Sequence, residues 1–113
     1  MSRGWRIADS DWNHWPDGLS DQQLWPEVAA AGLTGVEVGV YDVHTELSPH
    51  RLDEREKLAA THGVAVAAML LSLPGERWPD GALTGRPEAV AEQVRGCARA
   101  CRRFGLGTLG VWP

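Results

Sequence analysis

The stretch AAAGLTGVEVGV, residues 29–40, joins the end of an expected helix to a short apolar run through a glycine. The same order recurs in AATHGVAVAAMLLSL, residues 59–73, and in RRFGLGTLGVWP, residues 102–113. Gly32, Gly63 and Gly105 stand where a helix commonly ends in a left-handed residue. The runs that follow are rich in Val, Leu and Ala, as strands buried on both faces are. This repetition predicts an α/β fold with a parallel sheet.

The whole chain divides into four expected strands and three expected helices. The strands cover residues 5–8, 35–40, 64–71 and 108–112. The first helix opens at Ser20, which forms a capping-box pair with Gln23. Pro26 lies beyond its first turn and predicts a kink or a true start near Trp25. The other two helices cover residues 49–62 and 87–104, and residues 9–18, 41–47 and 72–85 are expected loops.

The resulting order is β-α-β-α-β-α-β, and right-handed crossovers make all four strands parallel. An open four-stranded sheet and the first half of a (β/α)8 TIM barrel both fit this order. The first loop, DSDWNHWPDGLSD, has no glycine-rich phosphate fingerprint, so a dinucleotide site is not expected. The last strand has no following helix to cover it, and two sheet edges stay unpaired. We therefore expect residues 1–113 to form one partial domain, half of a (β/α)8 barrel.

Composition narrows the class of protein. The chain has 113 residues, a net charge of −4 and no block of Lys or Arg, so nucleic acid is not an expected partner. No apolar run approaches the roughly 20 residues of a membrane span, and the N-terminus lacks a secretion signal. A cytoplasmic protein without membrane contact is expected. Cys97 and Cys101 fall on the apolar stripe of the third helix and are expected to be buried, without a disulfide or zinc role.

Three segments resemble the N-terminal half of the sugar phosphate isomerase/epimerase family, the xylose-isomerase-like TIM barrels. They are LWPEVAAAGLTGVEVGVYD at residues 24–42, LAATHGVAVAAML at residues 58–70 and EAVAEQVRGCARACRRFGLGTLGVWP at residues 88–113. The resemblance implies metal-assisted proton transfer on a small sugar or polyol carbonyl compound, with Mn, Mg or Co as the divalent metal. The family's catalytic and metal-binding residues lie mainly on the fifth to eighth strands. No catalytic residue or metal ligand is therefore assigned to this chain.

Candidate substrate-binding residues lie where parallel strands end, because ligands of such folds bind at the carboxyl ends of strands. Four of the six tryptophans fall in these positions, and flat aromatic walls suit the C–H faces of a sugar. Glu37 lies inside the second strand and points away from Val36 and Val38. The predicted substrate-binding residues are Trp12, His14, Glu37, His44 and Trp112.

Each of these residues also has a structural interpretation. The tryptophans would seal a barrel mouth, Glu37 would be paired inside the barrel, and the loop histidines would be solvated. A metal site built from His14, Asp42 and His44 requires a proximity that the sequence does not supply. The leading hypothesis is a sugar isomerase/epimerase-like protein, or its N-terminal part, whose metal ligands come from a C-terminal half or a separate chain. The alternative is a non-catalytic half-barrel that self-associates as a homo-oligomer or serves as a binding subunit.

Overall fold

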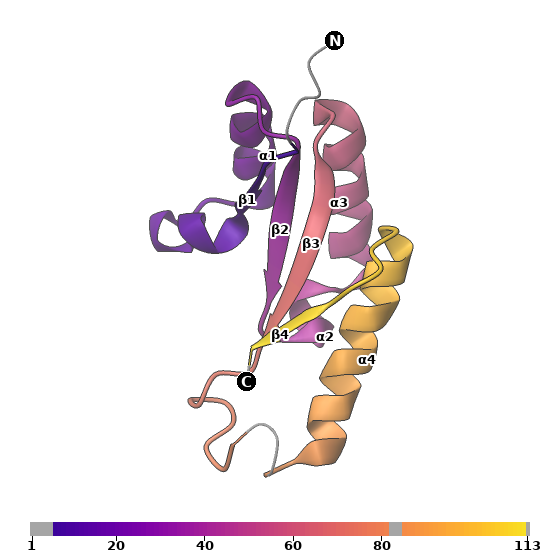
Figure 1. Ribbon diagram of the computed structural model, residues 1–113. Helices are drawn as coiled ribbons and strands as arrows, with labels where there is room; N and C mark the ends of the chain where they lie inside the picture. The colour runs from indigo at the N-terminus through magenta and orange to yellow at the C-terminus, as the bar shows by residue number, and fades with distance from the viewer. Residues whose placement is uncertain (1–5, 82–84, 113) are drawn as a thin grey trace.

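In the computed structural model, which describes residues 6–81 and 85–112, four strands form one sheet in chain order (Figure 1). Every neighbouring pair is parallel. The predicted parallel α/β sheet is thus confirmed. The strands are β1 (Ala8–Ser10), β2 (Gly35–Val40), β3 (Ala65–Ser72) and β4 (Gly110–Trp112).

The connecting segments are largely helical. They comprise η1 (Asp11–Asp17), α1 (Asp21–Ala30), α2 (Val43–Glu46), α3 (Pro49–His62) and α4 (Pro87–Arg103). The helices expected at residues 49–62 and 87–104 are confirmed. So are the left-handed glycines after α1, α3 and α4, whose φ angles are +77° at Gly32, +68° at Gly63 and +72° at Gly105. The α4 helix carries Glu88 in its first turn and Arg102 and Arg103 in its last, as the helix dipole favours.

Helix α1 begins at Asp21, so the alternative start near Trp25 is wrong. Gln23 Oε1 accepts a hydrogen bond from the backbone N–H of Ser20 at 2.9 Å, which fixes the first turn. Pro26 remains inside the helix. The lost backbone hydrogen bond is offset by burial, because Leu24 and Trp25 are 2% and 0% exposed.

Two predictions near the strand ends need correction. The first strand runs from Ala8 to Ser10 rather than over residues 5–8, and Trp5 lies outside the described residues. The polar side chains of Asp9 and Ser10 are tolerated there because both have hydrogen-bond partners. The expected loops at residues 9–18 and 41–47 contain the short helices η1 and α2. Ser10 and Asp42 cap them by accepting hydrogen bonds from the N–H groups two residues on.

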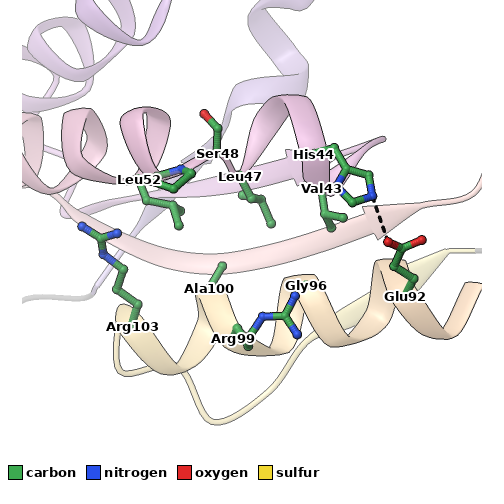
Figure 2. A pocket seen from close by; sticks show the side chains of 11 residues that line it. Val43, His44, Leu47, Ser48, Leu52, Glu92, Gly96, Arg99, Ala100 and Arg103 are labelled. Carbon is green, nitrogen blue, oxygen red and sulfur yellow. Dashed lines mark ion pairs between the residues drawn. The ribbon is translucent and has the colours of Figure 1, made fainter.

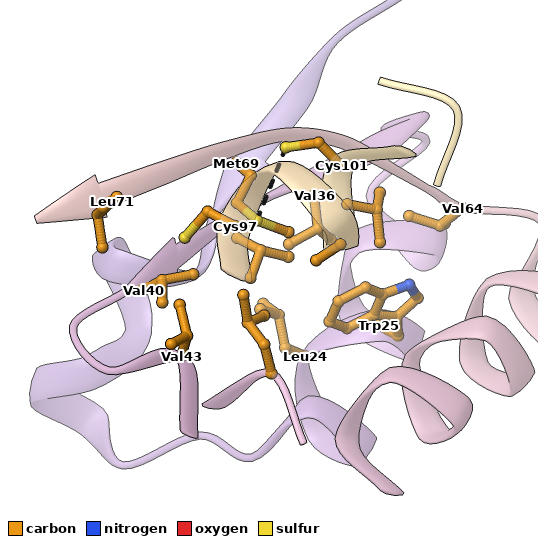
Figure 3. Packing of buried hydrophobic residues seen from close by; sticks show 14 of the residues in the cluster. Leu24, Trp25, Val36, Val40, Val43, Val64, Met69, Leu71, Cys97 and Cys101 are labelled. Atoms are coloured by element: carbon orange, nitrogen blue, oxygen red, sulfur yellow. Dashed lines mark hydrogen bonds between the residues drawn. The ribbon is translucent and has the colours of Figure 1, made fainter. Parts of the chain in front are cut away.

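The hydrophobic core lies between one face of the sheet and the helices α1, α3 and α4 (Figure 3). Val36, Val38 and Val40 of β2 alternate toward this layer and are fully buried. Cys97 and Cys101 of α4 pack onto it as free, buried thiols, and Cys101 Sγ lies 3.9 Å from the Met69 sulfur. The predicted structural role of the two cysteines is confirmed. No helix in the described ranges is both long and apolar enough to cross a lipid bilayer.

The opposite face of the sheet, called here the open face, carries mostly small or polar residues, together with Leu70 and Trp112. Register places Gly35, Glu37 and Gly39 of β2 beside residues of β3 that share this face. Part of it is open to solvent, since Ala65 and Ala67 are exposed. The open-face residues of the strands are Ala8, Ser10, Gly35, Glu37, Gly39, Ala65, Ala68, Leu70, Ser72, Gly110 and Trp112.

Candidate functional site

Trp12 lies on the open face directly above Gly39. It is the second residue of η1, which directly follows β1. Its indole Nε1 lies 1.3 Å from the position that a Cβ on residue 39 would take. Only a glycine leaves room for this ring. The carboxyl-terminal part of β2 is therefore covered by an aromatic side chain from the neighbouring connection.

Trp12 is the centre of a group of rings called here the aromatic stack, made by Trp12, Trp15, Tyr41 and Trp112. Trp12 stacks on Trp15 with centroids 5.1 Å apart and on Trp112 with centroids 6.2 Å apart, at interplanar angles of 19° and 8°. Tyr41 lies against both Trp12 and Trp15, with centroids at 5.4 and 4.9 Å. Such pairs contribute about 0.5–1.5 kcal/mol each beyond area burial. The stack thus links the carboxyl ends of β1, β2 and β4.

A cavity of about 400 Å³ opens between the stack and the segment after β3. Trp78 forms a buried part of its wall, and the Arg86 guanidinium lies 4.6 Å from that ring. The buried Trp78 Nε1 has no hydrogen-bond partner among the described residues. The lining residues are Trp12, Ser72, Leu73, Pro74, Gly75, Trp78, Gly81 and Trp112.

Glu37 supplies a carboxylate to the same face. It lies two residues before Gly39, so its side chain projects beside the position that Trp12 covers. Ser10 of β1 is its register partner, and Ser10 Oγ donates a hydrogen bond to Glu37 Oε1 at 3.2 Å. Glu37 is half-buried, and within residues 6–81 and 85–112 its second oxygen accepts no hydrogen bond. Trp12, Glu37 and Trp112 are therefore gathered on one face at one end of the sheet.

His14 is held elsewhere. Its Nε2 pairs with Asp9 Oδ2, and Asp9 alternates with Ser10 along β1, so this pair projects from the other face of the strand. Burial raises the pKa of Asp9, but hydrogen bonds from His14 and Asn13 outweigh it and leave the pKa below its usual value. The Asp9 carboxylate thus orients the imidazole of His14 rather than presenting it to Glu37.

His44 belongs to the helical layer. It lies on α2 with its side chain 64% exposed, and its Nε2 is 3.2 Å from Glu92 Oε1 of α4. Together with Leu47, Gly96 and Arg99 it lines a second cavity of about 400 Å³ between α2 and α4 (Figure 2). This cavity lies on the helical side of the sheet. The structure therefore separates His44 from the aromatic stack.

A buried polar cluster lies behind the stack. Asp11 is 5% exposed, and its Oδ1 accepts the backbone N–H of Gly39 at 2.9 Å. Burial raises the pKa of Asp11 to about 7, although the Gly39 N–H and the Arg55 charge both act to lower it. Arg55, 2% exposed, donates to the Glu46 carbonyl at 2.8 Å. Its Nε lies 3.2 Å from Asp21 Oδ2, an ion pair without hydrogen-bond alignment.

Two residues of this arrangement were not predicted. Ser10 was missed because the first strand was expected to end at Ala8, and extending that strand by two residues would have placed Ser10 beside Glu37. Arg55 follows Leu52 by three residues and so lies on the inward stripe of α3. An arginine on this apolar face was the sequence signal that could have predicted a buried, paired charge. Within residues 6–81 and 85–112, no group of three His, Cys, Asp or Glu side chains is placed to hold a metal ion.

Comparisons with protein-family models, curated proteins and solved structures return no match to this chain. The site is therefore interpreted from its own geometry.

Proposed function

We propose that this chain is one half of a (β/α)8-type barrel and that it binds a small sugar or polyol on its open face. The observation that carries the proposal is that Trp12, stacked on Trp112, covers Gly39 on the same face as the Glu37 carboxylate, which accepts a hydrogen bond from Ser10. Ligands of parallel α/β folds bind at this end of the sheet.

The half-barrel part of the proposal is supported by strand order. The strands follow one another as β1-β2-β3-β4, whereas a doubly wound sheet reverses direction at a switch point. Helices α1, α3 and α4 share one core with the Val36–Val40 face of β2. In a barrel, the open face would be the inner wall.

The ligand class is supported by the chemistry of the wall. A sugar presents apolar C–H faces and polar hydroxyls on one small body. The 59%-exposed ring of Trp112 offers a stacking surface, and the Glu37 carboxylate accepts hydrogen bonds from hydroxyl groups. Trp78 adds a buried ring to the wall of the adjoining cavity. This combination of flat rings and few polar groups is typical of small-ligand sites.

The proposed reaction class is sugar isomerisation or epimerisation, on the resemblance of residues 24–42, 58–70 and 88–113. The divalent metal that this resemblance implies finds no ligand set among the described residues. The role proposed for this chain is therefore substrate binding, with Glu37 orienting a hydroxyl and the tryptophans orienting the ring. Fold likeness alone would not assign this role; the Trp12–Trp112 stack and the Glu37 carboxylate on the same face support it.

The test is a titration of the full chain with a ketohexose, an aldohexose and a cyclitol, followed by tryptophan fluorescence and calorimetry. We expect saturable binding of at least one of the three. Trp112→Ala removes a stacking surface and should weaken binding three- to tenfold, since such contacts contribute about 0.5–1.5 kcal/mol. Glu37→Gln should weaken it about tenfold or more, because hydrogen bonds to charged groups contribute about 1.5–3 kcal/mol.

His50→Ala is the control. The exposed His50 ring lies on α3, in the helical layer and away from both sheet edges. It should leave affinity unchanged. Binding that is insensitive to both Trp112→Ala and Glu37→Gln, or no binding of any of the three compounds, would refute the proposal.

A further inference from the structure

The exposed large apolar side chains of the described residues lie at the two edges of the sheet. They are Ile7, next to β1, and Val111 and Trp112 on β4, with exposures of 53%, 41% and 59%. Ile7 and Val111 project toward the helical side, whereas Trp112 projects from the open face. Unpaired edges of this kind are templates for pairing with another strand. Both edges thus carry apolar surface and pair with no further strand among the described residues, although the outer Ser10 N–H of β1 donates to Asp9 Oδ1 at 2.9 Å.

The register of the sheet sets a quantitative condition on what can pair there. Ala8 is level with Gly35 on β2, whereas Gly110 is level with Gly39 through Leu70. The paired part of β4 therefore begins four residues further along the sheet than that of β1. A (β/α)8 barrel has a shear of about eight residues, or about four for each half. The offset of four residues between Ala8 and Gly110 therefore equals the shear of half a barrel. This agreement holds if Gly110 pairs with Ala8 of the next half.

We propose that a second copy of this chain completes the barrel, with β4 of each copy pairing in parallel with β1 of the other. Gly110 lies opposite Ala8 of the partner subunit, and Trp112 lies opposite Ser10 of the partner subunit. A two-fold axis along the barrel keeps all eight strands parallel and creates two identical seams, as a closed dimer requires. This proposal rests on the half-barrel architecture proposed above.

The seam matches in side-chain type as well as in register. Ala8 and Gly110 both belong to the open face and are small, so they meet without steric conflict. Val111 lies opposite Asp9 of the partner subunit on the helical side and diagonal to Ile7 of the partner subunit, so the pairing covers both apolar side chains. Register is normally fixed in this way, because a one-residue slip would move every side chain to the wrong face.

The dimer also changes the ligand site. Trp112 becomes a neighbour of Ser10 of the partner subunit. Within each chain, Ser10 donates a hydrogen bond to Glu37, so Trp112 also comes near Glu37 of the partner subunit. The stacking surface and the carboxylate that face one ligand would then come from different copies. The site formed by one copy alone is open on the side where β4 ends.

The first measurement is the mass of the full chain in solution by light scattering after gel filtration. The expected mass is twice 12.3 kDa. The Ile7→Lys/Val111→Lys variant places charges at both seams and should shift the mass to that of one chain. A mass of one chain for the unaltered protein, or an open series of larger species, would overturn the proposal and assign the β4 edge to another polypeptide.

The second measurement tests the register by disulfide trapping. Ala8 and Gly110 of one chain are three strand spacings apart, about 14 Å, which exceeds the reach of a disulfide. A bond in Ala8→Cys/Gly110→Cys must therefore join two chains. A Cβ on Gly110 meets only the flexible end of Leu70, at 2.9 Å, as its near neighbour below 3 Å, so the substitution is tolerated. We expect a covalent dimer on a non-reducing gel.

The controls are Ala8→Cys/Val111→Cys, whose second thiol projects from the other face, and each single variant, which tests for trapping through Cys97 or Cys101. None should form the dimer efficiently. If Ala8→Cys/Val111→Cys formed as much covalent dimer as Ala8→Cys/Gly110→Cys, the proposed pairing of Gly110 with Ala8 of the partner subunit would be wrong. A monomer whose sugar affinity depends on Trp112 would refute the dimer but support the proposed sugar binding. A trapped dimer that binds no sugar would support the dimer but refute the proposed sugar binding.

Discussion

Trp12 occupies the space above Gly39 that any larger residue would need, with its Nε1 only 1.3 Å from the position of a Cβ there. Trp12 belongs to η1, the connection after β1, whereas Gly39 belongs to the neighbouring strand β2, and their contact sets the position of the aromatic stack. Asp11, the residue before Trp12, accepts the Gly39 backbone N–H. The start of η1 is therefore tied to β2 by one hydrogen bond and one ring contact.

Gly39→Ala should displace Trp12 and disorder the stack. Overpacking of this kind costs about 1–3 kcal/mol, and more where a rigid ring cannot move aside. We expect a lower free energy of unfolding in urea and a loss of the near-ultraviolet circular dichroism that stacked indoles produce. Gly75→Ala is the control, because a Cβ at Gly75 meets nothing within 4 Å and should leave both signals unchanged. Unaltered dichroism in Gly39→Ala would contradict the stack described here.

Asp11 should make the protein less stable as the pH rises. Burial raises its pKa from 3.8 to about 7 in the folded state. The stabilisation is full below pH 3.8, where the carboxyl is neutral in both states, and is lost as the pH rises through 7. Each pKa unit corresponds to about 1.4 kcal/mol. Urea unfolding between pH 4 and 8 should therefore show a decline that is absent in Asp11→Asn.

The Asn side chain keeps an oxygen that can accept the Gly39 N–H, so this variant removes the charge and preserves the contact. The exposed Asp17 of the same η1 segment provides the control, and Asp17→Asn should retain the decline. Identical pH profiles for the unaltered protein and Asp11→Asn would show that Asp11 does not control this stability change.

Arg51 and Arg55 allow a comparison of an exposed and a buried ion pair to the same carboxylate. Both lie 3.2 Å from Asp21 Oδ2, but the Arg51 side chain is 38% exposed and that of Arg55 only 2%. Arg55→Met should lower the free energy of unfolding by about 3–5 kcal/mol, because it leaves the buried Asp21 carboxylate and the Glu46 carbonyl without this partner. Arg51→Met should cost at most about 1 kcal/mol. Equal losses in thermal or urea unfolding would contradict this ranking.

Cys97 and Cys101 should resist thiol reagents in the folded protein. Burial raises the pKa of the Cys97 thiol to about 12 and also raises that of Cys101. Since the thiolate is the reactive form, both should react with an aromatic disulfide at pH 8 only as fast as the protein opens. Two equivalents should react at once in concentrated urea. Rapid reaction of either thiol without denaturant would place it outside the core.

Glu37 and Trp12 show which parts of the candidate site can be predicted from local sequence pattern. Glu37 was expected to point away from Val36 and Val38, and strand alternation alone places it on the open face. That Trp12 would stack on Trp112 was beyond the sequence, because it depends on the pairing of β4 with β3 and on the absence of a side chain at Gly39. His14 and His44 occupied equivalent predicted loops, yet Asp9 and Glu92 hold them away from the open face.

The sequence by itself determined the three longer helices and the strands between them, since helix ends at Gly32, Gly63 and Gly105 and the apolar runs after them are local signals. It also determined the parallel sheet and the apolar stripe of α4 that carries Cys97 and Cys101. Only the tertiary structure decided which side chains meet, because the stack, the Ser10–Glu37 pair and the burial of Arg55 join residues far apart in the chain. Such contacts depend on register and strand order, and each is set by the packing of the whole sheet rather than by any short segment.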